Sequence, residues 1–108
     1  MSERAHSGMQ VWVFMGEKGQ YPMGVWSSLP LAHRYIHDQA LTGSLTAYEL
    51  DLPAYEAAIN SGQFKPSKDQ HRSHKFRQTF SNRYQEHYNF REGHCASLGN
   101  PQYATDEE

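Results

Sequence analysis

The chain has 108 residues, of which 37% are hydrophobic and 20% are charged, and this size and composition fit one small globular domain. No stretch approaches the roughly 20 apolar residues that span a bilayer, and the first eight residues contain no apolar run typical of a signal peptide. The one cysteine, Cys95, excludes an internal disulfide and a zinc site made of several cysteines. We therefore expect a cytoplasmic protein that does not contact a membrane.

Charge is distributed unevenly along the chain, although the net charge is only −2. Residues 1–60 carry 3 basic and 6 acidic side chains, residues 61–91 carry 7 and 2, and residues 92–108 carry none and 4. A basic block between acidic flanks can attract an acidic partner, but a solvated helix face with its usual lysines and arginines explains the same count, and we favour that interpretation.

Two strands joined by a loop are predicted near the N-terminus. Gln10–Met15 combines β-branched and aromatic side chains over the length of a strand. Glycine and proline in residues 16–22 predict a loop, and Met23–Ser27 resumes an extended pattern. The pattern indicates an antiparallel hairpin.

A helix and a third strand follow the hairpin. Ser28 is a good N-cap, because its hydroxyl can accept a hydrogen bond from a free backbone N–H of the first helical turn. Apolar residues then recur at three- and four-residue spacing and predict a helix over residues 29–41. Gly43 is expected to end this helix with a positive φ angle, and the alternation in residues 44–50 predicts a strand.

A second, shorter helix is predicted after the third strand. Asp51 is expected to cap it, and Pro53 is tolerated in its first turn because a proline there removes no hydrogen bond. Gly62 is expected to end the helix.

The last third of the sequence allows two interpretations. Phe76, Phe80 and Tyr84 lie four residues apart and predict a helix near residues 72–82. Residues 85–91 can extend this helix or form a fourth strand. We favour the strand, because Tyr88 and Phe90 suit one face of a sheet.

The predicted element order is therefore β-β-α-β-α-α-β, which indicates a small α/β protein of the α+β class. We expect three to four mainly antiparallel strands in one sheet, with two to three helices. One domain is predicted over residues 10–93, between a flexible N-terminus at residues 1–9 and a flexible acidic tail at residues 94–108.

A resemblance to a known family is carried by the segments Val11–Glu17, Tyr21–Ser28 and Leu41–Tyr48. A later signature consists of Tyr55, Ala58, Ile59, Gly62, Phe64–Pro66 and Tyr84–Tyr88. Over about residues 10–93 the chain resembles small bacterial domains of unknown function, which are similar to immunity proteins encoded beside bacterial toxins. The resemblance implies a compact domain that neutralises a toxin.

Histidine pairs are the candidates for a metal site. His33 and His37 are four residues apart on the predicted helix, so both rings can point the same way, but the helix supplies no third ligand. His71 and His74 lie among cationic residues, whose charge disfavours a divalent cation, and we assign them to a basic surface. We expect neither a metal nor another cofactor.

No arrangement of residues identifies a reaction, and we expect no catalytic residues. If the protein is an enzyme, Glu17, Glu86 and His87 are the candidates for general acid–base chemistry. His94 and Cys95 are adjacent, and their side chains are expected to diverge too far to act as a base and a nucleophile.

A protein–protein interaction module is the leading functional hypothesis, and with the resemblance it becomes an immunity protein that binds a cognate toxin or another protein. The candidate contact residues are Tyr21, Trp26, Arg72, Arg83, His87 and Tyr88. The alternative is a nucleic-acid-associated regulator that uses the basic, aromatic residues 65–91. The helical spacing of the rings and a sequence pI of about 6.4 argue against this alternative.

Overall fold

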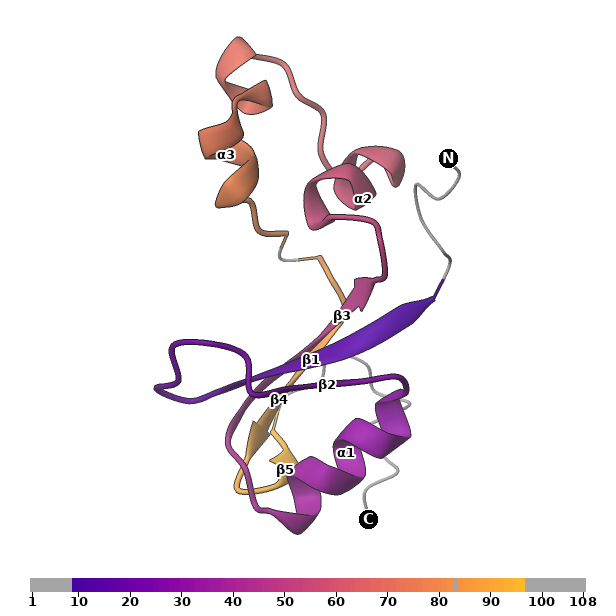
Figure 1. The fold of residues 1–108 in the computed structure, drawn as a ribbon, viewed down its shortest axis with the longest axis vertical. Coiled ribbons are helices and arrows are strands. Elements are labelled where there is room, and N and C mark those ends of the chain that lie inside the picture. Colours follow the sequence, from indigo (N-terminus) through magenta and orange to yellow (C-terminus); the bar gives the residue numbers. More distant parts are fainter. Residues whose placement is uncertain (1–8, 83, 97–108) are drawn as a thin grey trace. The chain divides into compact units, whose positions relative to one another are not determined.

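The computed structural model describes residues 9–82 and 84–96 and confirms the predicted α+β class (Figure 1). In the described residues, the α-helices and strands follow the order β-β-α-β-α-α-β-β. The chain divides into two compact units, and we describe each by itself. Residues 10–48 and 86–96 are named the sheet unit, and Met9 with residues 49–85 is named the helical unit. The prediction of one domain over residues 10–93 stays a prediction.

The sheet has five strands in the described part of the chain: β1 (Gln10–Gly16), β2 (Gly24–Trp26), β3 (Gly43–Glu49), β4 (His87–Arg91) and β5 (His94–Cys95). Their order across the sheet is β2-β1-β3-β4-β5. The pairs β1–β2, β3–β4 and β4–β5 are antiparallel. The Glu17 N–H donates to the Thr42 carbonyl oxygen and the Leu50 N–H donates to the Met9 carbonyl oxygen, so β1 and β3 also run antiparallel.

Helix α1 (Leu29–Asp38) packs on one face of this sheet. Alternate side chains of β1, β3 and β4 point to that face, as the two-residue period of a strand requires. The buried core consists of Trp12, Phe14, Ala32, Ile36, Leu45, Ala47, Tyr88 and Phe90. Because complete burial of one large apolar side chain contributes about 1.5–3 kcal/mol, this face supplies most of the stability of the sheet unit.

The predicted start of α1 is confirmed, and its predicted end is wrong. The Leu31 N–H donates to the Ser28 hydroxyl at 3.3 Å, so Ser28 is the N-cap. The helix ends at Asp38 instead of residue 41, and Ala40 takes the positive φ, at 55°. Gly43 is the first residue of β3, where a Cβ atom would collide with the Met15 carbonyl oxygen. The glycine therefore serves the close approach of β3 to β1 and does not end the helix.

The favoured strand at residues 85–91 is confirmed as β4, which is followed by a tight turn. Glu92 and Gly93 have φ angles of 50° and 88°, as a two-residue hairpin loop requires. The turn leads into β5, which the sequence interpretation missed and which places His94 and Cys95 in the sheet, beyond the predicted domain end at residue 93. The rest of the predicted tail and the predicted flexible residues 1–8 lie outside the described residues.

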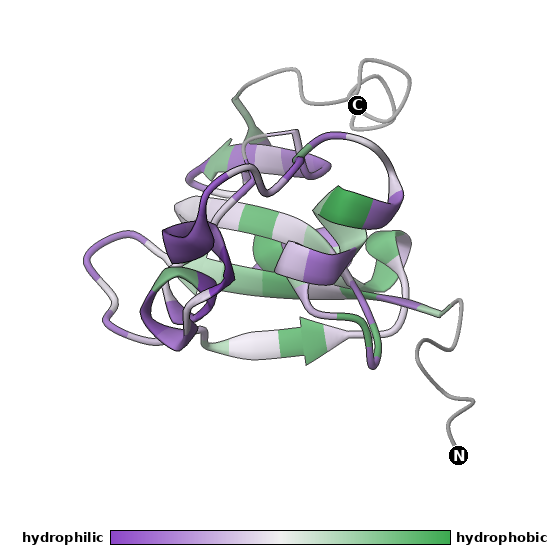
Figure 2. Cartoon of the chain, turned by 90° about the horizontal axis from the view of Figure 1, so that it is seen from above, coloured by the Kyte–Doolittle hydropathy of each residue, from purple (hydrophilic) through white to green (hydrophobic). Residues whose placement is uncertain are grey.

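The helical unit contains α2 (Ala54–Asn60), the 3-10 helix η2 (Asp69–Arg72) and α3 (His74–Gln78). Figure 2 shows that hydrophilic residues dominate η2 and α3. Asp51 does not cap α2 as predicted, because it adopts a φ of 68° in a turn and Pro53 is the N-cap residue. Gly62 has the expected positive φ, at 83°.

Helix α3 is shorter than the helix predicted near residues 72–82. Its N-cap is Ser73, whose hydroxyl accepts a hydrogen bond from the Phe76 N–H at 3.1 Å. The capping serine separates α3 from η2, which divides the predicted helix into two pieces. None of the helices in the described residues has the length and apolar composition needed to cross a bilayer.

Gly43→Ala is expected to lower the free energy of unfolding by about 2 kcal/mol, because the new methyl group meets the backbone of β1. Gly16→Ala is the matched control across the same strand pair, since its methyl group would find only ordinary contacts, at 3.9 Å from Phe14 and 4.0 Å from Thr42. The control should change stability by less than about 1 kcal/mol. Urea unfolding followed by tryptophan fluorescence measures both changes, and equal losses would contradict the close approach.

Candidate functional site

A cluster of aromatic rings forms the core of the helical unit. The Tyr55 ring lies 5.9 Å from Phe64, 6.3 Å from Phe76 and 5.5 Å from Phe80, measured between ring centroids. Phe64 and Phe76 stack at 5.6 Å. The Tyr55 hydroxyl donates to the His71 carbonyl oxygen at 2.7 Å. Tyr55 on α2 therefore connects this helix to both η2 and α3.

His71 belongs to this core and not to the basic surface to which we assigned it. Its Nδ1 atom accepts hydrogen bonds from the Ser67 N–H at 3.1 Å and the Lys68 N–H at 3.3 Å. Its ring lies 5.1 Å from Phe76. The side chain is half-buried, and it holds the loop before η2 against the rings.

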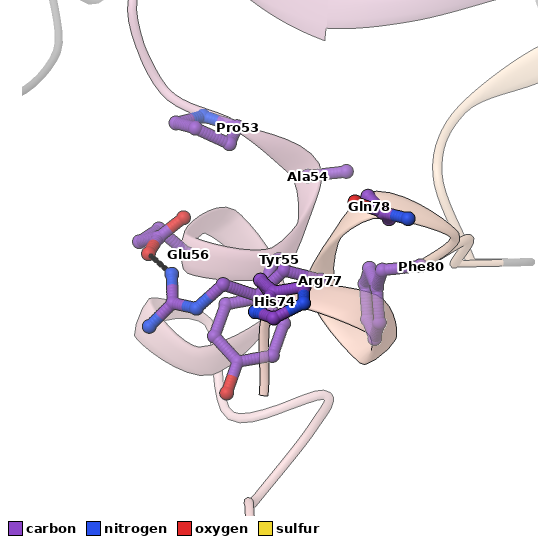
Figure 3. Close-up of a pocket in the computed structure, with 8 residues that line it drawn as sticks. All are labelled: Pro53, Ala54, Tyr55, Glu56, His74, Arg77, Gln78 and Phe80. Atoms are coloured by element: carbon purple, nitrogen blue, oxygen red, sulfur yellow. Dashed lines mark hydrogen bonds and ion pairs between the residues drawn. The ribbon is translucent and has the colours of Figure 1, made fainter. Parts of the chain in front are cut away.

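A pocket of about 410 Å³ lies between α2 and α3 (Figure 3). It is lined by Pro53, Ala54, Tyr55, Glu56, His74, Arg77, Gln78 and Phe80. The Arg77 guanidinium carbon lies 4.3 Å from the centre of the Tyr55 ring, and Arg77 also forms a 2.5 Å ion pair with Glu56. The pocket thus combines an aromatic wall with one cation whose orientation is fixed by a ring.

A second hollow, of about 390 Å³, shares Phe80 with the first. Its other lining residues are Gln63, Phe64, Phe76, Thr79, Ser81, Asn82 and Tyr84. The Asn82 side-chain amide donates to the Gln63 side-chain oxygen at 2.7 Å, and this bond joins the segments that precede η2 and follow α3.

The segment that contributes most of these aromatic rings also carries several exposed lysines and arginines. Residues 61–82 contain five lysines and arginines and one carboxylate, Asp69. Arg77 pairs with Glu56, whereas the other four cations form no ion pair with any described residue; they are Lys65, Lys68, Arg72 and Lys75. The Arg72 guanidinium donates to the carbonyl oxygens of Pro66 and Lys68, which holds it on the loop between these residues. This segment therefore presents positive charge that the described part of the chain leaves uncompensated.

Two of the predicted contact residues are accessible, one in each unit. Arg72 is exposed on η2, and Tyr21 is 77% exposed in the loop between β1 and β2. Arg83 lies outside the described residues. The structure consequently does not gather the predicted contact residues within one unit.

The other three predicted contact residues lie in the sheet unit, where they are buried or packed against other side chains. Tyr88 is completely buried in the core, so we withdraw it from the contact set. Trp26 packs 5.7 Å from Tyr35, between ring centroids, and its ring covers Gly24. His87 is half-buried on β4, opposite Thr46 of β3.

The candidate acid–base residues do not converge. The Glu17 N–H bonds to Thr42, whereas the Glu86 carbonyl oxygen accepts from the Ala47 N–H, and five residues of extended chain span roughly 17 Å. The Glu86 carboxylate accepts a hydrogen bond from the Tyr88 hydroxyl at 2.6 Å. Neither pocket described above is lined by Glu17, Glu86 or His87.

Three histidines of the sheet unit, His33, His37 and His94, lie near one another without forming a ligand set. His37 lies 5.2 Å from His94 and 6.4 Å from His33, between ring centroids. His33 is half-buried and packs on Phe90, so it does not lie on a solvated helix face. Within residues 9–82 and 84–96, no three His, Cys, Asp or Glu side chains are placed to hold a metal ion.

The pocket residues Tyr55, Glu56, His74 and Arg77 were not singled out as a site by the sequence interpretation. Tyr55 entered that interpretation through the family resemblance, and His74 only as part of a basic surface. Glu56 and Arg77 are 21 residues apart, and no helical or strand period relates them.

The fold and the pocket define a small α+β protein in which a helical segment between β3 and β4 presents basic and aromatic side chains around a hollow. The chain belongs to the family described as Domain of unknown function (DUF7710), whose model matches residues 11–96. No curated protein and no solved structure is significantly similar to the chain. Membership of this family therefore assigns no activity to the chain.

Tyr55→Phe is expected to destabilise the helical unit by about 0.5–1.5 kcal/mol, because it removes the hydrogen bond to His71 and keeps the ring. Amide hydrogen exchange measures this locally at the Arg77 N–H, which donates to the Ser73 carbonyl oxygen. Tyr48→Phe, which removes an exposed hydroxyl of the sheet unit, is the control. Unchanged exchange at Arg77 in Tyr55→Phe would show that the hydroxyl does not connect α2 to η2.

Proposed function

We propose that the chain is a protein–protein interaction module that binds an acidic surface of its partner through the helical unit. The observation that carries the proposal is the set of four exposed cations that have no ion partner among the described residues, in a segment that also forms an aromatic pocket. Binding interfaces combine a concave or aromatic centre with a charged rim, and arginine and tyrosine are enriched where most of the binding energy lies.

Electrostatics determines the kind of protein that fits. Lys65, Lys68, Arg72 and Lys75 repel one another mildly in the free chain, and a partner with Asp and Glu would relieve this repulsion. Such complementarity accelerates association and selects against basic partners. The charge of this segment therefore favours an acidic partner protein.

The finer form of the proposal is that the partner is a bacterial toxin that the chain neutralises in the cytoplasm. Its support is the sequence resemblance to immunity proteins. In this form the helical unit either occludes the active site of the toxin or holds the toxin in an inactive conformation.

Nucleic acid fits the same cations less well, because most of the rings needed for base stacking are buried or half-buried. Phe76 and Phe80 are half-buried against Tyr55 and Phe64, and Tyr88 is buried in the sheet unit. Of the Phe and Tyr rings described in residues 65–91, only Tyr84 is exposed, at 62%. With a single accessible ring, single-stranded binding would rest mainly on phosphate contacts and would fall steeply with added salt.

Site-specific photo-cross-linking in the native host tests the proposed function. A benzoylphenylalanine at the exposed Gln78 position is expected to cross-link to a protein segment rich in Asp and Glu, identified by mass spectrometry. The same probe at Lys18, in the loop after β1, should give no such adduct.

Charge reversal provides the matched comparison. Lys68→Glu combined with Arg72→Glu should weaken binding of the identified partner about tenfold or more at low salt. Lys18→Glu combined with Arg34→Glu makes the same charge change in the sheet unit and should have a much smaller effect. Adducts to nucleic acid, or equal effects of the two double variants, would overturn the proposal.

A further inference from the structure

We propose that Glu56 occupies the place on Arg77 that a carboxylate of the partner takes on binding, so that the pocket recognises an acidic peptide segment with one bulky apolar side chain. This inference rests on the proposed function and specifies the chemistry of the partner at one site. Arg77 has an unusual position, because it contacts the ring cluster and also forms part of the pocket wall.

The pair between Arg77 and Glu56 is suited to exchange. The two side chains are 46% and 38% exposed, and ion pairs at this exposure contribute little to stability. A carboxylate from another chain can therefore replace Glu56 at small cost, because it forms the same kind of bond with the same guanidinium.

Arg77 does not depend on Glu56 for its orientation. Its guanidinium lies 4.3 Å from the centre of the Tyr55 ring, in the geometry of a cation–π contact. Tyr55 is itself fixed by its neighbouring rings and by its hydrogen bond to His71. The guanidinium thus stays in place when the carboxylate changes, which reduces the entropic cost of binding.

The rest of the pocket specifies an apolar side chain beside that carboxylate. Pro53, Ala54 and Phe80 contribute apolar lining, and the Phe80 ring lies 5.5 Å from the Tyr55 ring between centroids (Figure 3). The volume of about 410 Å³ lies within the range of roughly 300–1,000 Å³ that small-molecule sites occupy. One aromatic or large aliphatic side chain fits this description.

Charge complementarity selects an acidic peptide as the occupant. The segment that supplies α3 carries four further exposed cations without described ion partners and only one carboxylate, Asp69. A basic or neutral segment would place no carboxylate near Arg77 and would gain nothing from these charges.

A fluorescein-labelled peptide, Glu-Glu-Trp-Glu-Glu, tests this inference by fluorescence anisotropy with the full chain at low salt. Glu56→Gln is expected to tighten binding about two- to fivefold, because it removes a competitor worth the energy of one exposed ion pair. Asp69→Asn changes the net charge equally without freeing Arg77, and it should have a smaller effect. Arg77→Gln should weaken binding more than the charge-matched Lys75→Gln.

The peptide in which alanine replaces tryptophan should bind at least several-fold more weakly. Circular dichroism of each variant verifies that the helices remain. The inference is overturned if Glu56→Gln binds no tighter than Asp69→Asn, if the alanine peptide binds equally well, or if the tryptophan peptide shows no saturable binding. If the cross-linked partner still requires Lys68 and Arg72 in that case, the proposed function stands and only this inference about the pocket falls.

Discussion

The helical unit depends on the contacts of a single side chain, Tyr55. Helices α2 and α3 have seven and five residues, whereas an isolated helix needs about 12–15 residues to be even marginally stable in water. Tertiary packing must therefore supply the stability that local hydrogen bonds cannot. The Tyr55 ring contacts Phe64, Phe76 and Phe80, and its hydroxyl bonds to η2. Both hollows are lined by members of this cluster, so the site exists only while the cluster holds.

Because aromatic rings form the core of the helical unit, other side chains must form the surface that contacts a partner. A core built from a few rings has no interior position for lysine or arginine, since an unpaired charge there would lose its hydration. The cations of residues 61–82 consequently lie outside, whereas Phe64, Phe76 and Phe80 are at least half-buried and offer little ring surface to a nucleic acid. What the surface retains is positive charge and a hollow with an apolar wall, which together suit an acidic protein segment.

Much of the fold follows from local sequence patterns, because strand alternation and the Ser28 cap act within a few residues. The errors arise where local signals compete: Ser73 caps a new helix inside the predicted one, and Asp51 adopts a turn instead of a cap. The pocket could not be predicted, because it depends on the packing of α2 against α3. Neither the contact of Arg77 with Tyr55 nor its pairing with Glu56 leaves a periodic trace in the sequence.

Arg77 shows how one residue can serve both the fold and the proposed binding. A planar guanidinium can lie against a ring and still offer its edge to a carboxylate, which the compact ammonium group of lysine cannot do with the same geometry. The lysines of the segment are exposed and form no ion pair with a described residue, so they act mainly through their charge at a distance. Long-range attraction accelerates encounter, whereas an oriented, partly desolvated pair slows dissociation. The exposed lysines are thus suited to attract an acidic partner, and Arg77 to retain it.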